Sequence, residues 1–227
     1  MANFQTRIED IIGSVSSLGA DGSSDTEQAI DDALTDTASE IFNLIPDSLL
    51  FPFSVRETPV TGNPVINDIE GLRILGAERQ NGNDAQTISY ISCVYIDPTL
   101  ISKVQHPNSI YFATQEAPVW TIFNRDLYIY PEPGTGGPYD DANGAVAITV
   151  TAPTVSATDS SIAVFPNELE HVVVLGACAR LKQRQISFFN EDEDSEVVAL
   201  HRAQYAELDQ KYKETLSPFV ARRDSDA

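Results

Sequence analysis

Apolar and polar positions in the first fifty residues alternate with the period of an amphipathic helix. A short helix is predicted at 4–18, and a second, longer helix is predicted to end before Pro46. Ser24 and Glu27 have the spacing of a capping box and predict where the second helix begins. The apolar face of the second helix consists of Ile30, Ala33, Leu34, Ala38, Ile41, Phe42 and Ile45.

The middle of the chain is predicted to form strands. Ile, Val, Tyr and Thr are frequent there, Pro and Gly recur, and helical periodicity is absent. Asn81-Gly82 and Asn124-Arg125 predict tight turns, and the Pro- and Gly-rich sequence at 131–138 predicts a loop. Short strands at this spacing are typical of an antiparallel sandwich or barrel-like domain. The expected strands are 69–77, 87–96, 109–113, 119–123, 126–130 and 145–151.

The last quarter of the chain returns to helical periodicity. Asn167 and Glu170 have capping-box spacing at the start of a helix that is predicted to end near Phe189. Its Val172–Ala179 stretch is apolar, and small residues within that stretch would let a neighbouring helix approach closely.

A second helix is predicted to begin at Ser195, after the short acidic sequence Glu191-Asp-Glu-Asp194. A short turn between two long helices predicts an antiparallel αα-hairpin. Pro218 is expected to end the second helix and to leave an extended arm at 218–227.

Together these elements predict an α+β fold, in which a β domain is inserted into a helical bundle. The expected segments are N-terminal bundle helices at 1–50, a β-rich insertion at 51–165, a helical hairpin at 166–217 and the arm at 218–227. Helices with apolar stripes need partners, so the two helical segments are expected to pack together. The residues predicted to form bundle or subunit contacts are Ile30, Leu34, Ile41, Val172, Gly176, Ala179, Leu208 and Tyr212.

Charge narrows the possible partners. The 227 residues include 14 Lys and Arg and 34 Asp and Glu, which gives a formal net charge of -20. Such an acidic chain is not expected to grip duplex DNA or an anionic membrane, because both require clustered cations. Eight of the 14 cations lie in residues 166–227. No apolar stretch is long enough to cross a bilayer, and two lone cysteines predict no disulfide framework, so we expect a soluble protein made in the cytoplasm.

The sequence has no recognisable catalytic motif. Phosphate-binding loops, nucleophile elbows and zinc-protease motifs are absent, and the three histidines have no metal-ligand spacing. We therefore expect no catalytic residues, no cofactor and no metal site. An enzyme acting through the acids at 191–194 and His201 is the weakest alternative.

The segment Ala117-Pro-Val-Trp-Thr-Ile-Phe-Asn-Arg-Asp-Leu-Tyr-Ile-Tyr-Pro-Glu-Pro133 and the strand sequence Val146–Pro153 resemble the β core of tailed-bacteriophage head-to-tail adaptor (neck) proteins. The continuation Phe165–Leu181 and the helix Val197–Leu216 resemble the same family. The resemblance covers most of the chain and lies in layout rather than in invariant catalytic residues.

The resemblance implies a structural virion protein of the neck, without enzymatic activity, that is present in the host cytoplasm during assembly. It implies a ring, usually of twelve copies, under the portal protein, with tail, nozzle or tail-terminator proteins as further partners and DNA only passing through the channel. It also implies a C-terminal arm that docks on the portal. The composition of this arm, apolar residues followed by arginines, suits such an anchor. Its expected docking residues are Phe219, Val220, Arg222 and Arg223.

An alternative function is a carbohydrate- or receptor-binding module of a phage tail. It rests on the aromatic strand sequence around Trp120, Tyr128 and Tyr130, and requires these side chains to lie exposed on a groove.

Overall fold

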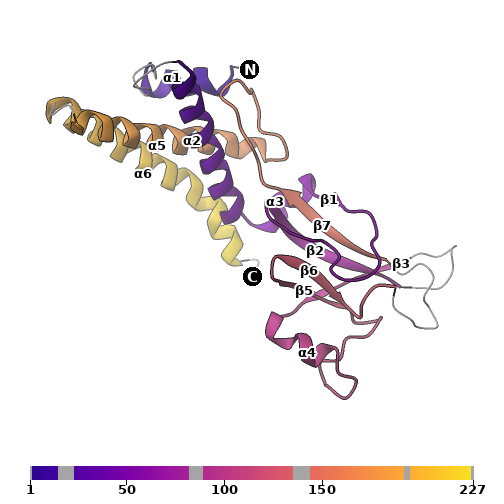
Figure 1. Cartoon of the computed structure of the whole chain (residues 1–227). Coiled ribbons are helices and arrows are strands. Elements are labelled where there is room, and N and C mark those ends of the chain that lie inside the picture. The colour runs from indigo at the N-terminus through magenta and orange to yellow at the C-terminus, as the bar shows by residue number, and fades with distance from the viewer. Residues whose placement is uncertain (1, 15–22, 82–88, 135–143, 192–194, 226–227) are drawn as a thin grey trace. The chain divides into compact units, whose positions relative to one another are not determined.

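The computed structural model describes residues 2–14, 23–81, 89–134, 144–191 and 195–225. Contacts divide the chain into two compact units. The helical unit consists of Met1–Pro52 and Ala152–Ala227, and the β unit consists of Phe53–Thr151. The long helices and the strands thus lie in different units, which confirms the α+β class (Figure 1).

The helical unit is organised around one central helix. Helix α5 (Glu170–Glu191) packs against α1 (Phe4–Ile12), α2 (Ser23–Leu44) and α6 (Ser195–Ser225). A helix surrounded on three sides must be apolar around most of its circumference. Accordingly, its buried apolar residues are Val172, Val173, Val174, Leu175, Ala177, Cys178, Ala179 and Leu181. The short helix α3 (Asp47–Leu50) and a 3-10 turn, η1 (Phe51–Phe53), follow α2.

The segment at 152–165 lies with the helices, whereas the sequence placed it in the β insertion. The backbone N–H groups of Phe4 and Gln5 donate to the carbonyls of Asp159 and Ala157, respectively, which ties the start of α1 to this segment. Thr35 of α2 exchanges hydrogen bonds with the backbone of Val155. These bonds satisfy backbone groups of an otherwise irregular segment, which fixes it on α1 and α2.

Three predicted helix boundaries are wrong. The first helix ends at Ile12 rather than Leu18, because Gly13 follows with φ of 80°, which an α-helix does not accommodate. The capping box of Asn167 does not form: this residue begins a 3-10 turn, η3 (Asn167–Leu169), and α5 follows from Glu170. The third error is the expected extended arm. Helix α6 includes Pro218 and continues to Ser225, so this part of the chain is helical.

The β unit contains two sheets. The four-stranded sheet has the order β1 (Val55–Arg56), β7 (Ala145–Thr151), β2 (Leu72–Asn81) and β3 (Ser89–Ser92), all antiparallel. The three-stranded sheet has the order β4 (Val94–Tyr95), β5 (Val119–Phe123) and β6 (Asp126–Tyr130). Both sheets contribute to one core, which contains Val65, Ala77, Cys93, Leu127, Ile129, Ala145 and Ala147. Between β4 and β5 lie a 3-10 turn, η2 (Pro98–Leu100), and the short helix α4 (Ile101–Val104).

Three strands occur as predicted: β5, β6 and β7 have the expected bounds. The turn between β5 and β6 is also confirmed, with φ of 53° at Asn124 and 68° at Arg125. The expected all-antiparallel arrangement is wrong at β4, which pairs with β5 in parallel. The connection between them, which includes η2 and α4, is long enough to return the chain to the end of the sheet where β4 begins.

The expected strand at 109–113 is absent. Its residues form turns instead, since Ser109 N–H donates to the His106 carbonyl and Phe112 N–H donates to the Ser109 carbonyl. The preceding sequence, with Pro107 and Asn108, favours a turn over a paired strand. As a result, apolar side chains that a strand would have buried are exposed.

Candidate functional site

The predicted packing residues meet inside the helical unit. The seven with side chains are all buried: Ile30, Leu34, Ile41, Val172, Ala179, Leu208 and Tyr212. Gly176 of α5 marks the closest approach of three helices. A Cβ at this position would lie 2.4 Å from Thr37 Cγ2 of α2 and 3.0 Å from the ring of Tyr212 on α6. These residues therefore hold one chain together; their role between subunits stays a prediction.

The predicted docking residues lie at the end of α6. This helix has 31 residues and its antiparallel partner α5 has 22, so about the last two turns of α6 extend beyond the start of α5. Phe219 and Val220 lie in this extension and are half-buried. Arg222 and Arg223 belong to the same helix, beyond the side chains that the structure describes.

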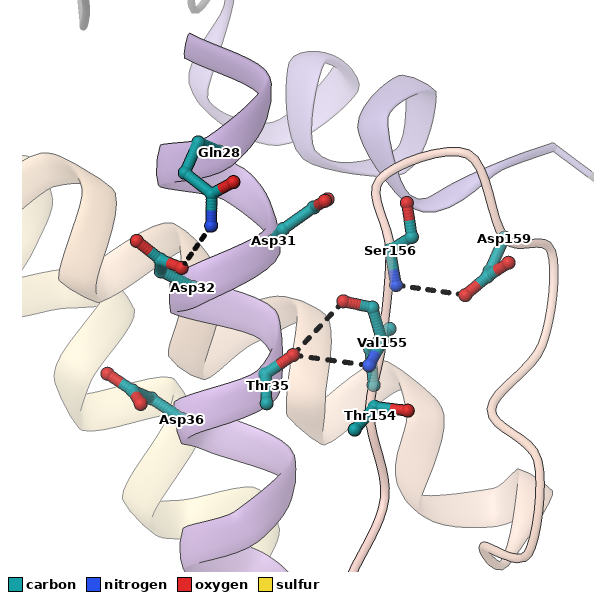
Figure 2. Close-up of a pocket in the computed structure, with 9 residues that line it drawn as sticks. All are labelled: Gln28, Asp31, Asp32, Thr35, Asp36, Thr154, Val155, Ser156 and Asp159. Carbon is teal, nitrogen blue, oxygen red and sulfur yellow. Dashed lines mark hydrogen bonds between the residues drawn. The ribbon is translucent and has the colours of Figure 1, made fainter. Parts of the chain in front are cut away.

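An acidic groove follows the seam between α2 and the 152–165 segment (Figure 2). It has a volume of about 610 Å³ and is lined by Gln28, Asp31, Asp32, Thr35, Asp36, Thr154, Val155, Ser156 and Asp159. Asp31 accepts a 2.6 Å hydrogen bond from Ala157 N–H, and Asp159 accepts one of 2.9 Å from Ser156 N–H. Asp31 and Asp159 thus hold the backbone of the 152–165 segment in place. The carboxylates of the groove also concentrate negative charge on one face of α2.

Glu170 ties three parts of the helical unit together. Its carboxylate accepts a 2.9 Å hydrogen bond from Ile162 N–H and lies 3.4 Å from the guanidinium of Arg7 on α1. The Glu170 residue is 7% exposed, and a buried N–H group left without an acceptor is costly.

We expect Glu170→Ala to lower the free energy of unfolding by about 1–3 kcal/mol, because the Ile162 amide and Arg7 both lose their acceptor. Glu170→Gln retains an amide oxygen for Ile162 and should cost less. Chemical denaturation followed by circular dichroism measures both. Equal losses for the two variants would contradict the role given to the Ile162 hydrogen bond.

Apolar residues are exposed at one end of the β unit. Ile110 is 92% exposed, Tyr111 49% and Phe112 40%, and the three are consecutive in the loop after α4 (Figure 1). The sequence does not indicate this exposed surface, because the same residues fit a strand pattern. The turn-forming residues immediately before them were the available signal.

The aromatic hairpin β5–β6 does not form the exposed groove that carbohydrate binding requires. Trp120 is half-buried and packs edge-on against Tyr95, with ring centroids 5.0 Å apart. Tyr130 is 8% exposed and lies parallel to Tyr128 at 6.5 Å. The rings of Trp120, Tyr128 and Tyr130 thus pack against the cores of the β unit.

The titratable groups that could carry chemistry are dispersed. Burial raises the pKa of the Cys93 and Cys178 thiols to about 12, which keeps both protonated and unreactive near neutral pH. His201 Nδ1 lies 3.4 Å from Lys182 Nζ within the α5–α6 hairpin. Burial lowers the pKa of the Lys182 ammonium and, together with that charge, the pKa of His201. Among the described residues, no cluster of three potential metal ligands occurs.

The other sequence candidates are not brought together. His106 and His171 are exposed on different units. The acids at 192–194 and the glycine-rich loop at 135–137 lie outside the described residues. Within the residues that the structure describes, no helix has the length and hydropathy needed to span a membrane.

What the structure does contain is a helical unit with a tight three-helix contact and an acidic groove, and a β unit with exposed apolar residues. Exposed apolar surfaces of this kind suit the binding of other proteins. The family model described as SU10 adaptor protein matches residues 6–225, and the chain belongs to this family. It is thus a structural adaptor protein of bacteriophages and a component of the virion, in a family whose role is structural rather than enzymatic. Adaptors of this kind bind other head or tail proteins of the phage. No curated protein matches the chain.

Proposed function

We propose that this adaptor assembles into a ring under the portal protein of the capsid, joins the head to the tail, and surrounds the path of the DNA. Membership of the SU10 adaptor family supports a structural role between phage components. The resemblance of 117–133 and 146–153 to neck proteins supports the position in the virion. A ring of twelve copies is the stoichiometry that this resemblance implies.

The extension of α6 is the observation that carries the proposal. A helix end that continues beyond its hairpin partner provides a surface that a second protein can bind without disturbing the hairpin. It carries two half-buried apolar residues, Phe219 and Val220, followed by Arg222 and Arg223. Apolar anchors beside arginine are typical of the centres of protein interfaces. We therefore assign portal docking to this helical extension rather than to an extended arm.

The acidic face of α2 supports a DNA path without DNA binding. Asp32, Asp36 and Glu40 are exposed on this helix, and the acidic groove lies beside them. Arg180 pairs with Asp36 and Glu40 at 3.7 and 2.6 Å, which offsets only part of the charge. Like charge repels the phosphate backbone, so a wall of this kind allows duplex DNA to slide.

Native mass spectrometry of the purified protein, alone and with portal protein, tests the ring. The expected result is a closed oligomer of defined copy number in at least one of the two samples. A monomer in both samples would overturn the proposal.

Two truncations test docking by the extension. Removing 221–227 deletes both arginines and keeps Phe219 and Val220, whereas removing 218–227 deletes all four residues. We expect portal binding to weaken in the first variant and to be lost in the second, while far-ultraviolet circular dichroism retains the helical signal of the rest of the unit. Sedimentation with portal protein measures binding. Undiminished binding by the longer truncation would exclude the extension as the docking element.

A further inference from the structure

The seam between α5 and α6 changes character along its length. Near Gly176, where α2 also packs, it is tight and apolar. Further along α5 the seam buries polar side chains, since Lys182 and Gln185 are each 3% exposed. Figure 1 shows that the hairpin continues past its crossing with α2, and this part, at 182–191 and 195–204, is hereafter the outer end. Because apolar burial supplies most of the stability between helices, the outer end opens at a lower cost than the rest of the hairpin.

The outer end buries a lysine beside an imidazole. Lys182 Nζ of α5 lies 3.4 Å from His201 Nδ1 of α6. In the neutral tautomer with its hydrogen on Nε2, His201 accepts a hydrogen bond from the Lys182 ammonium through Nδ1. A buried ammonium without an acceptor is costly. Neutral His201 therefore stabilises the contact between the two helices.

Protonation of His201 turns this contact into a repulsive one. An imidazolium carries a hydrogen on each ring nitrogen and accepts no hydrogen bond, so Lys182 loses its acceptor when a proton from solvent binds Nδ1. Two cations then lie 3.4 Å apart at a seam where water screens them little. We propose that this pair makes the outer end of the α5–α6 hairpin a pH-sensitive element, closed while His201 is neutral and loosened when His201 is protonated.

The groups around the pair favour the neutral imidazole. Burial is the largest cause that lowers the pKa of His201 below its usual value of 6.5, and the Lys182 charge adds to it, whereas a side-chain hydrogen bond with Gln204 of α6 acts in the opposite direction. From α5, the Cys178 thiol also acts on Lys182. Burial raises the pKa of this thiol to about 12, so it adds no charge near neutral pH.

The direction of the pH dependence follows from that shift. Because the pKa of His201 is lower in the folded chain than in the unfolded chain, the unfolded chain binds the proton more tightly. The stabilising contribution of neutral His201 is therefore complete above the usual value of 6.5. It is lost as the pH falls from that value through the pKa of the folded state. The inference concerns a contact within one chain and does not depend on the proposed ring.

Amide hydrogen exchange followed by mass spectrometry tests the element on the full chain. The measurement is made at about pH 7.5 and about pH 5.5, with correction for the intrinsic exchange rate. We expect the protection of the outer end to fall roughly fivefold or more at the lower pH, while 172–179 keeps its protection. Outer-end protection that is equal at the two pH values would overturn the proposal.

Three variants identify the sensing group. His201→Gln keeps a hydrogen-bond acceptor that does not titrate, so its outer end should be equally protected at both pH values. Lys182→Met removes the second cation and should give a smaller response than the wild type. His171→Gln is the matched control, because His171 is an exposed histidine of the same helix α5, and it should respond as the wild type does. A wild-type response in the His201→Gln chain would exclude His201 as the sensor, and one in the Lys182→Met chain would exclude the pair.

A titration of the wild-type chain needs no substitution. Nuclear magnetic resonance follows the imidazole signals of His201 as the pH is lowered. We expect this histidine to titrate below the usual histidine range, and the amide signals of the outer end to change with the same midpoint. A midpoint at or above the usual range, or amide signals that do not follow it, would contradict the proposed coupling.

Discussion

Replacing Gly176 by valine is expected to destabilise the helical unit by about 3 kcal/mol or more, and replacement by alanine by less. The new Cβ would lie 2.4 Å from Thr37 Cγ2, a distance that requires atoms to move. Thr37 cannot rotate away without cost, because its hydroxyl donates a 2.7 Å hydrogen bond to the Ala33 carbonyl. Tyr212 blocks the other side at 3.0 Å. The gain in helix propensity, about 1 kcal/mol, does not offset this overlap.

Denaturant titration followed by circular dichroism measures the loss, and a double substitution identifies its cause. Thr37→Ser keeps the hydroxyl and removes the Cγ2 methyl group. Combined with Gly176→Ala, it should recover at least part of the lost stability, giving a favourable coupling energy in a double-mutant cycle. Gly76→Ala is the matched control, since its Cβ would meet Ile148 at an ordinary 4.0 Å. A Gly176→Ala variant as stable as the wild type would contradict the close approach of the three helices.

Phe165→Ala is expected to lower the free energy of unfolding by about 3–5 kcal/mol. Phe165 is among the largest fully buried side chains and ends the 152–165 segment that packs with α1 and α2. Its truncation leaves a cavity where the segment enters η3, and the surrounding helices can fill only part of it.

Val164, next to Phe165 in the chain, supplies the control for the Phe165→Ala variant. Val164 is 39% exposed and has a φ of 57°, which is strained for a β-branched residue. Val164→Ala should therefore change stability by no more than about 0.5 kcal/mol or increase it slightly. Denaturation curves for both variants test the pair. A loss below about 1 kcal/mol for Phe165→Ala would show that the 152–165 segment is not part of the core of the helical unit.

The helices could be predicted because apolar residues recur with helical periodicity over many residues. In α2, apolar residues recur at Ile30, Leu34 and Ile41, and all three are buried. The periodicity of a helix is a local property, so the sequence expresses it directly. Helix ends were less predictable. Pro218 was expected to stop α6, yet the helix continues, and only the fold reveals that α6 extends beyond α5.

The candidate surfaces were only partly predictable. Phe219 and Val220 could be proposed from composition and resemblance, but the strand pattern of 109–113 predicted burial for residues that are exposed. Whether a strand forms depends on a partner strand, and no strand among the residues that the structure describes pairs with 109–113. The acidic groove likewise combines α2 with residues more than a hundred positions later. No local sequence pattern indicates that these two segments lie side by side.

By itself, the sequence determined the α+β class, the order of a helical, a β and a second helical part, the bounds of β5, β6 and β7, the acidic character, and a resemblance to phage neck proteins. These follow from periodicity, composition and local turn chemistry, each of which acts over a few residues. The tertiary structure alone decided that 152–165 belongs with the helices, that β4 pairs in parallel, that Gly176 lies where α2, α5 and α6 approach closely, and that Ile110 is exposed. Each of these depends on which distant segments meet, because burial and backbone pairing are satisfied between elements rather than within them.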